Sequence, residues 1–238
     1  MSLKLVPQQR GIVHTYGFNL TAFEFTTDPS NISPNIILFV GGLGNGLLNI
    51  PYLPELADSA SNEFQSTDGW GTSSLDRDTS ELQSAIDISV QNVVVQGGIL
   101  QAPVSDSEAL SEREWILPQE YRKLTWGVPT SAYRFYSLAS KRGDDDYFSS
   151  YLTQEDYTKS FGKVNKPLLV LYGSIDEFVP EYVDKENLVS TWKQSTSSQY
   201  WSEHSQIIKG ATHNLGDGSD AGVIEHLVSV VKKFISDL

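Results

Sequence analysis

Short runs of consecutive apolar residues are the feature that most constrains the fold of this chain. They occupy residues 36–40, 93–95 continuing to 99–100, 167–172 and 206–209. Strands without polar alternation are typical of a parallel sheet, because helices cover both of its faces. A final helix is expected where apolar residues recur at helical spacing, at Val223, Ile224, Leu227, Val231, Phe234 and Ile235. Strands that alternate with helices predict an α/β fold with a mostly parallel sheet flanked by helices.

Two further segments complete the predicted organisation. Residues 10–16 and 20–26 are β-rich and are joined by Gly17-Phe18-Asn19, which predicts an N-terminal antiparallel hairpin. Residues 103–166 are too long for a simple crossover and are rich in aromatic side chains, so we expect a cap insertion over one end of the sheet. The rings can form the cap's own core, line a ligand pocket, or do both in part. Residues 1–238 are expected to form a single domain.

Composition excludes several classes of function. The chain has 30 acidic and 17 basic side chains, a formal net charge of -13 and no cysteine. So acidic a chain repels phosphate backbones and anionic lipid heads, which makes nucleic acid and membranes poor partners. The lack of cysteine excludes disulfides, thiol catalysis and thiolate metal sites. Residues 1–10 lack the apolar core of a signal peptide, and no apolar run approaches about 18 residues, so a soluble cytoplasmic protein is predicted.

Three strand ends carry residues that suggest chemistry, because reactive groups in parallel sheets lie at the carboxyl ends of strands. The glycine-rich residues 41–46 follow the first buried strand. Their N–H groups can approach a developing oxyanion, although such runs are often only tight turns. Asp176 follows the third buried strand, where a carboxylate either orients a histidine or caps the next helix. His213 follows the last strand, where a loop histidine can act as a general base.

Other signals point away from metals and nucleotides. The glycine run is neither a dinucleotide fingerprint nor a phosphate loop. The remaining histidines, His14, His204 and His226, have no strand-end placement, and no histidine pair has metal-ligand spacing, so neither a metal nor a cofactor is predicted. An early glycine turn followed by acid and then histidine on the last two strands is the order found in α/β-hydrolases. We therefore expect the Asp176 and His213 side chains to lie near hydrogen-bond distance.

Four strings of the sequence, residues 37–47, 71–78, 99–106 and 210–215, resemble one hydrolase family in order and over nearly the whole chain. It is the DUF1749-type α/β-hydrolase family, which includes the fungal siderophore (fusarinine C) esterase. The resemblance implies a serine esterase that needs no cofactor and acts on a small-molecule ester such as a siderophore. It further implies that Asp176 is the acid, that His213 is the base, and that Gly42 and Leu43 form the oxyanion turn. The oligomeric state does not follow from it.

The family's nucleophile is missing from this sequence. It lies in a Gly-His-Ser-Thr-Gly elbow between the second and third strings, and no Gly-x-Ser-x-Gly occurs anywhere in the chain. Residues 41–92 would have to hold two more strands and three helices, although each βαβ unit takes roughly 30 residues. No strand-like apolar run occurs between Leu56 and Ile86. The sequence therefore predicts that central strands are deleted, one near Phe64-Gln65 and another, with the elbow, near Ile86-Asp87.

Three explanations of the missing elbow are open at this point. The protein is a true pseudo-hydrolase, the sequence derives from a mis-spliced or mispredicted transcript, or another serine has taken over. Ser73 and Ser74 are the nearest candidates, but they lie in a string that the family retains beside its real nucleophile. Without an elbow serine Asp176 and His213 have nothing to activate, so impaired ester hydrolysis is expected. The alternative is a non-catalytic protein that uses the capped pocket to bind a small ligand or a protein partner.

Overall fold

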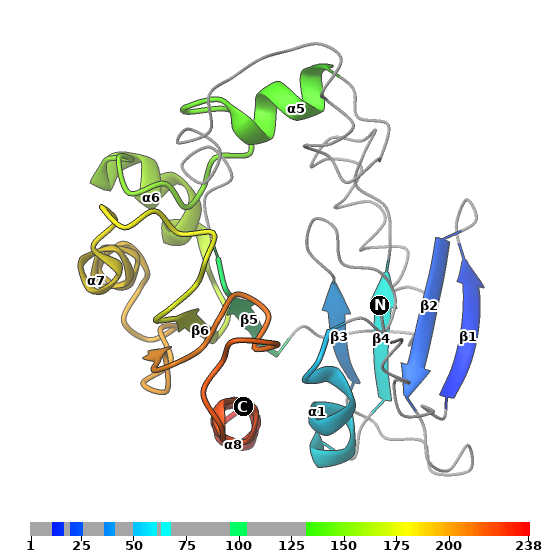
Figure 1. Ribbon diagram of the computed structural model, residues 1–238. Helices are drawn as coiled ribbons and strands as arrows, with labels where there is room; N and C mark the ends of the chain where they lie inside the picture. The colour runs from blue at the N-terminus through cyan, green and yellow to red at the C-terminus, as the bar shows by residue number, and fades with distance from the viewer. Residues whose placement is uncertain are drawn as a thin grey trace. The chain divides into compact units, whose positions relative to one another are not determined.

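The computed structural model describes residues 11–16, 20–25, 36–40, 50–60, 63–67, 96–103 and 132–238 (Figure 1). The chain divides into two compact units. The first consists of Met1–Trp70 with Asp78–Val93, and the second of Gly71–Arg77 with Val94–Leu238. The strands of the described residues form three sheets, with orders β1-β2, β3-β4 and β5-β6-β7. The predicted single domain with a cap at 103–166 stays a prediction.

The first unit begins with the predicted hairpin, which is confirmed. Strand β1 (Gly11–Tyr16) pairs antiparallel with β2 (Leu20–Phe25), in a register that runs from Gly11 opposite Phe25 to Tyr16 opposite Leu20. On β2, Phe23 and Phe25 are buried and two positions apart, so they share one face of the strand. Their rings meet edge to face, with centroids 4.9 Å apart. The connecting residues 17–19 lie outside the described part of the chain.

A parallel strand pair completes the described part of this unit. Strand β3 (Ile36–Val40) pairs with β4 (Glu63–Thr67), and β4 lies between β2 and β3 in Figure 1. Helix α1 (Leu53–Ala60) connects them and buries Leu53, Leu56 and Ala57. These positions are three and four residues apart and therefore lie on one helix face.

The expectation of a lost strand near Phe64-Gln65 is wrong, because β4 is that strand. Its string Glu-Phe-Gln-Ser-Thr has no continuous apolar run, so the pattern used to find buried strands passes over it. Its strand geometry is instead defined by parallel pairing, with Phe64 opposite Ile37 and Gln65 opposite Leu38. The second expected deletion, near Ile86-Asp87, falls outside the described residues.

The second unit contains the parallel sheet that the apolar runs predict. Strand β6 (Leu168–Gly173) lies in its centre, between β5 (Gly98–Gln101) and β7 (Gln206–Ile208), and both pairings are parallel. All six residues of β6 are buried, as expected for a strand covered on both faces. Residues 93–95 lie outside the described part of the chain, so the strand expected there is confirmed only from Gly98 onward.

One face of β6 packs against an aromatic cluster. Leu168, Val170 and Tyr172 belong to a buried core with residues of α6 (Gln154–Ser160), the 3₁₀ helix η1 (Phe161–Lys163) and α7 (Lys185–Ser195). Trp192 of α7 is fully buried in this core and stacks on Phe161, with ring centroids 5.5 Å apart. Because side chains alternate along a strand, Leu169 and Leu171 are buried on the opposite face.

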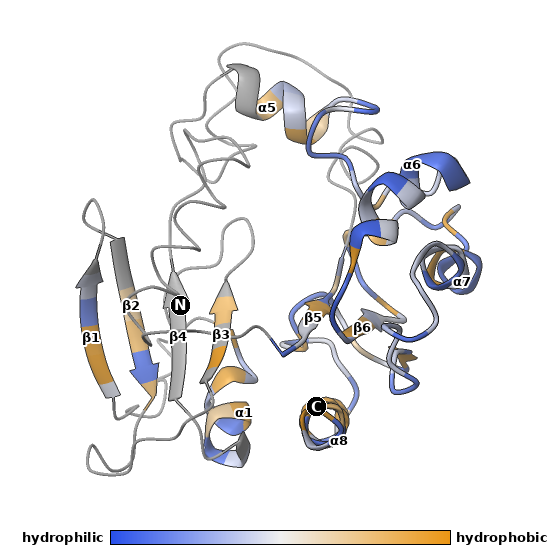
Figure 2. Ribbon diagram, turned by 180° about the vertical axis from the view of Figure 1, so that it is seen from behind, coloured by the Kyte–Doolittle hydropathy of each residue, from blue (hydrophilic) through white to orange (hydrophobic). Residues whose placement is uncertain are grey.

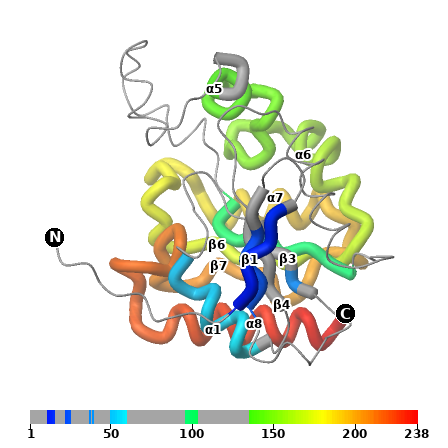
Figure 3. The backbone as a smooth tube through the Cα atoms, turned by 90° about the vertical axis from the view of Figure 1, so that its right-hand side faces the viewer, coloured from blue at the N-terminus to red at the C-terminus, as the bar shows by residue number. Residues whose placement is uncertain are grey.

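The C-terminal helix α8 (Val223–Ser236), red in Figure 3, has the amphipathic face that the sequence predicts. Val223, Leu227, Val231 and Phe234 are buried, and apolar colour marks this helix in Figure 2. It packs near the start of β5, because a Cβ built on Gly97 would lie 3.1 Å from the Phe234 ring. No described helix is long and apolar enough to cross a bilayer.

The part of the predicted cap that the structure describes, residues 132–166, contributes to the aromatic core around Trp192. Helix α5 (Ala132–Ala139) buries Phe135, whereas Tyr136 and Tyr147 are exposed. The Phe148 ring lies 5.9 Å from Trp192 and 6.3 Å from Phe161 between centroids, so it extends the aromatic cluster. This favours the core role for Phe148. Trp115, Tyr121 and Trp126 fall outside the described residues.

Candidate active site

Close backbone packing brings the loops after β6 and β7 together. A Cβ added to Gly173 would lie 2.6 Å from the Ala211 carbonyl oxygen, so only glycine allows the two backbones to approach this far. Beyond Gly173, the Ser174 N–H donates to the Ile208 carbonyl at 3.0 Å and the Ile175 N–H donates to the Ala211 carbonyl at 3.1 Å. The two loops that carry the predicted acid and base are therefore tied to each other by main-chain hydrogen bonds.

Asp176 and His213 meet at this junction. His213 Nδ1 lies 2.9 Å from Asp176 Oδ2, which confirms the expected hydrogen-bond distance. The second carboxylate oxygen, Oδ1, accepts the Phe178 backbone N–H at 3.0 Å, so both oxygens have partners. The Asp176 side chain is fully buried, whereas 24% of the His213 side chain is exposed. A buried acid that holds an accessible imidazole is the arrangement in which histidine accepts and returns a proton.

Three other side chains hold His213 in place. The Glu177 carboxylate accepts the His213 backbone N–H at 3.0 Å, and the Gln101 side-chain amide donates to the His213 carbonyl at 2.8 Å. The Phe178 ring meets the imidazole edge to face, with ring centroids 4.8 Å apart. The histidine is thus fixed at its main chain from both sides and at its ring. Gln101 ends β5, so it ties the first strand of this sheet to the loop after the last.

Unusual backbone conformations flank the pair. Ala102, directly after Gln101, has φ of 48°, and Leu215, two residues after His213, has φ of 55°. Both lie in the left-handed region that disfavours residues with a side chain, and both are buried. Such strain persists only where the surrounding structure enforces it, and it is found disproportionately at functional sites.

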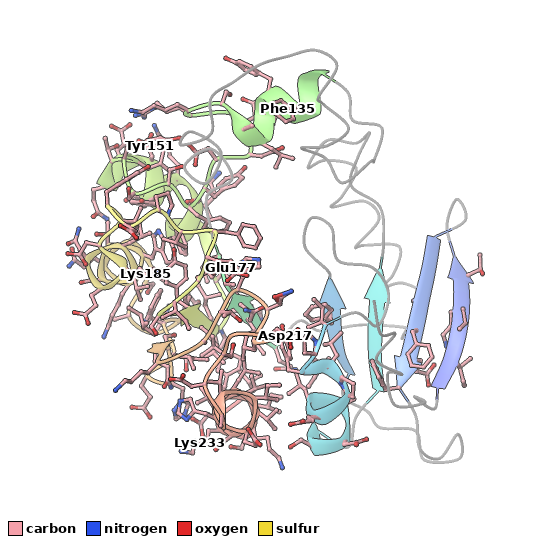
Figure 4. All side chains as sticks on the ribbon, viewed as in Figure 1. Phe135, Tyr151, Glu177, Lys185, Asp217 and Lys233 are labelled. Carbon is pink, nitrogen blue, oxygen red and sulfur yellow. The ribbon has the colours of Figure 1, made fainter. Side chains whose placement is uncertain are left out.

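Lys185, labelled in Figure 4, is the first residue of α7 and reaches back to the end of β6. Its Nζ donates to the carbonyls of Gly173 at 3.2 Å and Ser174 at 2.8 Å. Burial lowers the pKa of the Lys185 ammonium, while the negative charges of Asp176 and Glu177 act in the opposite direction. Sequence reasoning missed Lys185, Gln101, Glu177 and Phe178. Only Glu177 and Phe178 had an available signal, because they directly follow the predicted acid.

Gly42, Leu43, Ser73 and Ser74 lie outside the described residues, so the oxyanion turn stays a prediction, as do the catalytic roles of Asp176 and His213.

The remaining histidines make local contacts of their own. His14 pairs with Glu24 at 2.6 Å on the hairpin, and His226 Nε2 lies 2.8 Å from Gln206 Oε1. His204 Nε2 lies 2.7 Å from Asp237 Oδ2. Together with Glu203, His204 and Asp237 form a group whose possible ligand atoms all lie within 4.8 Å of one another, as metal binding would require. No other such group of three occurs among the described residues. Glu203 and Asp237 are exposed.

Comparisons of sequence relate the chain to hydrolases. The family model described as protein of unknown function DUF1749 matches residues 1–93 and 111–236. A UPF0613 protein of Schizosaccharomyces pombe is 33% identical, over 94% of this chain and 98% of that protein. The fusarinine C esterase of Aspergillus fumigatus is 28% identical, over 96% of each chain. These two alignments extend over 310 and 346 positions, more than the 238 residues present here, so the relatives contain segments that this chain lacks.

Comparisons of structure agree. A siderophore hydrolase from Aspergillus fumigatus superposes with a TM-score of 0.82 and 27% identity, covering 98% of each chain. An esterase from Butyrivibrio proteoclasticus superposes with a TM-score of 0.54 at 16% identity, which supports the fold alone. The family model covers most of the chain, and the parallel strands, the hairpin and the helices agree with these hydrolases. The chain therefore belongs to the DUF1749 family and has the α/β-hydrolase fold.

Proposed function

We propose that this protein is a carboxylic-ester hydrolase of the siderophore-esterase type whose activity is impaired because it lacks the nucleophile elbow. The observation that carries the proposal is the 2.9 Å contact between His213 Nδ1 and the buried Asp176 carboxylate at the ends of neighbouring strands. The family supports it, because relatives of this chain are esterases. The lack of any Gly-x-Ser-x-Gly supports the impairment.

In the proposed chemistry, Asp176 and His213 are the acid and base of a serine-hydrolase triad. Asp176 orients the imidazole through Nδ1 and stabilises the imidazolium, while Nε2 takes the proton from a serine hydroxyl as it attacks the ester carbonyl. Gly42 and Leu43 would donate backbone N–H groups to the oxyanion of the tetrahedral intermediate. The proton then passes from His213 to the leaving alcohol. Without the serine this sequence of steps cannot begin, which is why the acid–base pair alone gives little turnover.

The substrate in this proposal is a small-molecule ester, with siderophores as the first class to test, because the esterase relative is named for fusarinine C. The net charge of -13 supports the further proposal that the protein binds neither nucleic acid nor anionic membranes, and the lack of cysteine is compatible with a cytoplasmic location.

The decisive experiment compares this chain with a version in which the Gly-His-Ser-Thr-Gly segment of a relative is inserted at Ile86-Asp87. We expect the restored chain to react stoichiometrically with a fluorophosphonate probe and to hydrolyse p-nitrophenyl acetate, and His213→Ala to remove that turnover. His226→Ala is the matched control, because His226 lies on α8 and contacts Gln206. Turnover of a folded, restored chain that survives His213→Ala would contradict the assigned base.

A second function, binding without catalysis, is favoured by the same missing elbow. Such a protein would keep the fold and the acid–base pair, but the unmodified chain would not react with a fluorophosphonate probe. Isothermal titration of the unmodified chain with ferric and iron-free siderophore esters tests it. Stoichiometric labelling of the unmodified chain, together with turnover abolished by His213→Ala, would instead make three serines the candidate nucleophiles: Ser73 and Ser74, and Ser105 in the string at residues 99–106.

A further inference from the structure

Lys185 occupies a position that general rules disfavour for a cation. It is the first residue of α7, next to the N-cap Asp184, where the helix dipole favours negative side chains. The ammonium is also half-buried, and burial lowers the pKa of Lys185. Neither helix capping nor solvation therefore accounts for a lysine here. Some other interaction must offset both effects.

The contacts of the ammonium supply that interaction. Nζ donates to the carbonyls of Gly173 and Ser174, the two residues at which β6 ends and the loop to Asp176 begins. It lies 5.9 Å from the centre of the Tyr172 ring, one residue earlier. Asp176 and Glu177 are close enough for their charges to favour its protonated form. The same two carboxylates accept from His213, at Nδ1 and at the backbone N–H.

We propose that Lys185 is a positioning residue that clamps the end of β6 at Gly173 and Ser174 and supplies the counter-charge that keeps Asp176 buried and aimed at His213. The inference rests on the proposed function, which assigns Asp176 and His213 their catalytic roles. The positioning of Asp176 by Lys185 can nevertheless be measured without any turnover. Lys185 does not touch substrate in this scheme. It acts through the carbonyls of Gly173 and Ser174 and through the charge of Asp176.

The test is a spectroscopic one on the full chain. A histidine Nδ1–H that donates to a buried carboxylate is shielded from exchange and gives a downfield proton resonance, which ¹⁵N-histidine labelling assigns by its loss in His213→Asn. We expect Asp176→Asn and Lys185→Met to lose this resonance and Lys185→Arg to keep it. Lys193→Met is the matched control, because Lys193 is exposed in the last turn of the same helix and should leave the resonance unchanged.

The outcomes separate this inference from the proposed function. If the unsubstituted chain is folded by circular dichroism but lacks the resonance, the Asp176–His213 pair fails and the proposed function fails with it. If the resonance is present there and persists unchanged in folded Lys185→Met, only the role of Lys185 is overturned. Lys185→Gln keeps a donor without the charge, and circular dichroism monitors folding in every variant. Loss of the native circular dichroism spectrum at low temperature in both Lys185→Met and Lys185→Gln, where the unsubstituted chain retains it, would make Lys185 a general stability residue and would also overturn the inference.

Discussion

The two members of the acid–base pair differ in their exposure to water. The Asp176 side chain is fully buried with both oxygens hydrogen-bonded, whereas His213 keeps 24% of its side chain exposed. Burying a carboxylate is unfavourable unless it is paired and hydrogen-bonded. The contacts to His213 and to the Phe178 N–H meet that requirement. An exposed imidazole edge is what a substrate or a serine hydroxyl must reach, so the asymmetry suits a general base supported by a hidden acid.

Replacing the acid by an amide tests this arrangement at the level of a single residue. In the elbow-restored chain, we expect Asp176→Asn to lower kcat by about 10⁴-fold, the loss known for the equivalent change in a serine-protease triad. The reason is that an amide at this position favours the wrong imidazole tautomer. Steady-state hydrolysis of p-nitrophenyl acetate measures it. Glu177→Gln serves as the comparison, because Glu177 accepts from the His213 main chain rather than from its ring, and a much smaller loss is expected. Equal losses in the two variants would contradict the distinct role of Asp176.

The sequence predicts this pair better than it predicts the residues around it. Asp176 and His213 could be found because each follows a strand that an apolar run marks. Lys185 and Gln101 could not be found in this way, because their roles depend on distant contacts. Lys185 contacts Ser174, 11 positions earlier in the chain, and Gln101 contacts His213, 112 positions later. Such contacts are set by the packing of the sheet rather than by any local pattern.

At the level of strands and helices, runs of consecutive apolar residues predicted the apolar strands correctly but did not predict the polar strand β4. The runs that predicted β3, β6 and β7 are confirmed, and so is the buried face of α8. Strand β4 was missed because its residues are mostly polar and its place depends on parallel pairing with β3. A parallel pairing joins residues distant in the sequence, and no local spacing announces it.

The approach of β6 to the loop after β7 is the element-level feature that a small substitution can test. We expect Gly173→Ala to destabilise the second unit by about 1–3 kcal/mol, because its Cβ would overlap the Ala211 carbonyl and force the backbones apart. Urea unfolding followed by circular dichroism measures the free energy. Gly98→Ala on β5 is the matched control, since its Cβ would meet Leu168 Cδ1 at an ordinary 3.7 Å. Similar unfolding free energies in the two variants would show that the close approach is not required.

At the level of the whole molecule, family membership indicates that the hydrolase fold is retained, whereas the short chain indicates that segments of the family are absent. The family model and a TM-score of 0.82 show that the chain keeps the α/β-hydrolase fold. Alignments of 310 and 346 positions show that relatives hold segments absent from these 238 residues. In this fold the nucleophile elbow lies on a strand-to-helix turn, so losing the elbow string removes a strand end as well as a serine. We therefore expect the loss to affect stability and activity together.

The proposed loss of a central strand near Ile86-Asp87 has a consequence for stability, because it would leave neighbouring strands without a partner. Strands buried on both faces depend on having partners at their edges, and unpaired apolar edges promote aggregation. Burying one large apolar side chain contributes about 1.5–3 kcal/mol, so several half-covered ones could cancel most of a domain's net stability of about 5–15 kcal/mol. We expect the unmodified chain to be poorly soluble or low-melting, and inert towards p-nitrophenyl esters.

Restoring the absent segments from a relative should recover both properties in one molecule, a cooperative melt by scanning calorimetry and esterase turnover. A version that carries the restored strand but has alanine in place of the elbow serine is the control that separates them. It should melt like the fully restored chain, because the strand supplies the missing edge partner, and it should remain inactive, because His213 has no hydroxyl to activate. A sharp, high-temperature melt of the unmodified chain, together with ester turnover that His213→Ala abolishes, would show that this protein has compensated for the loss at both levels.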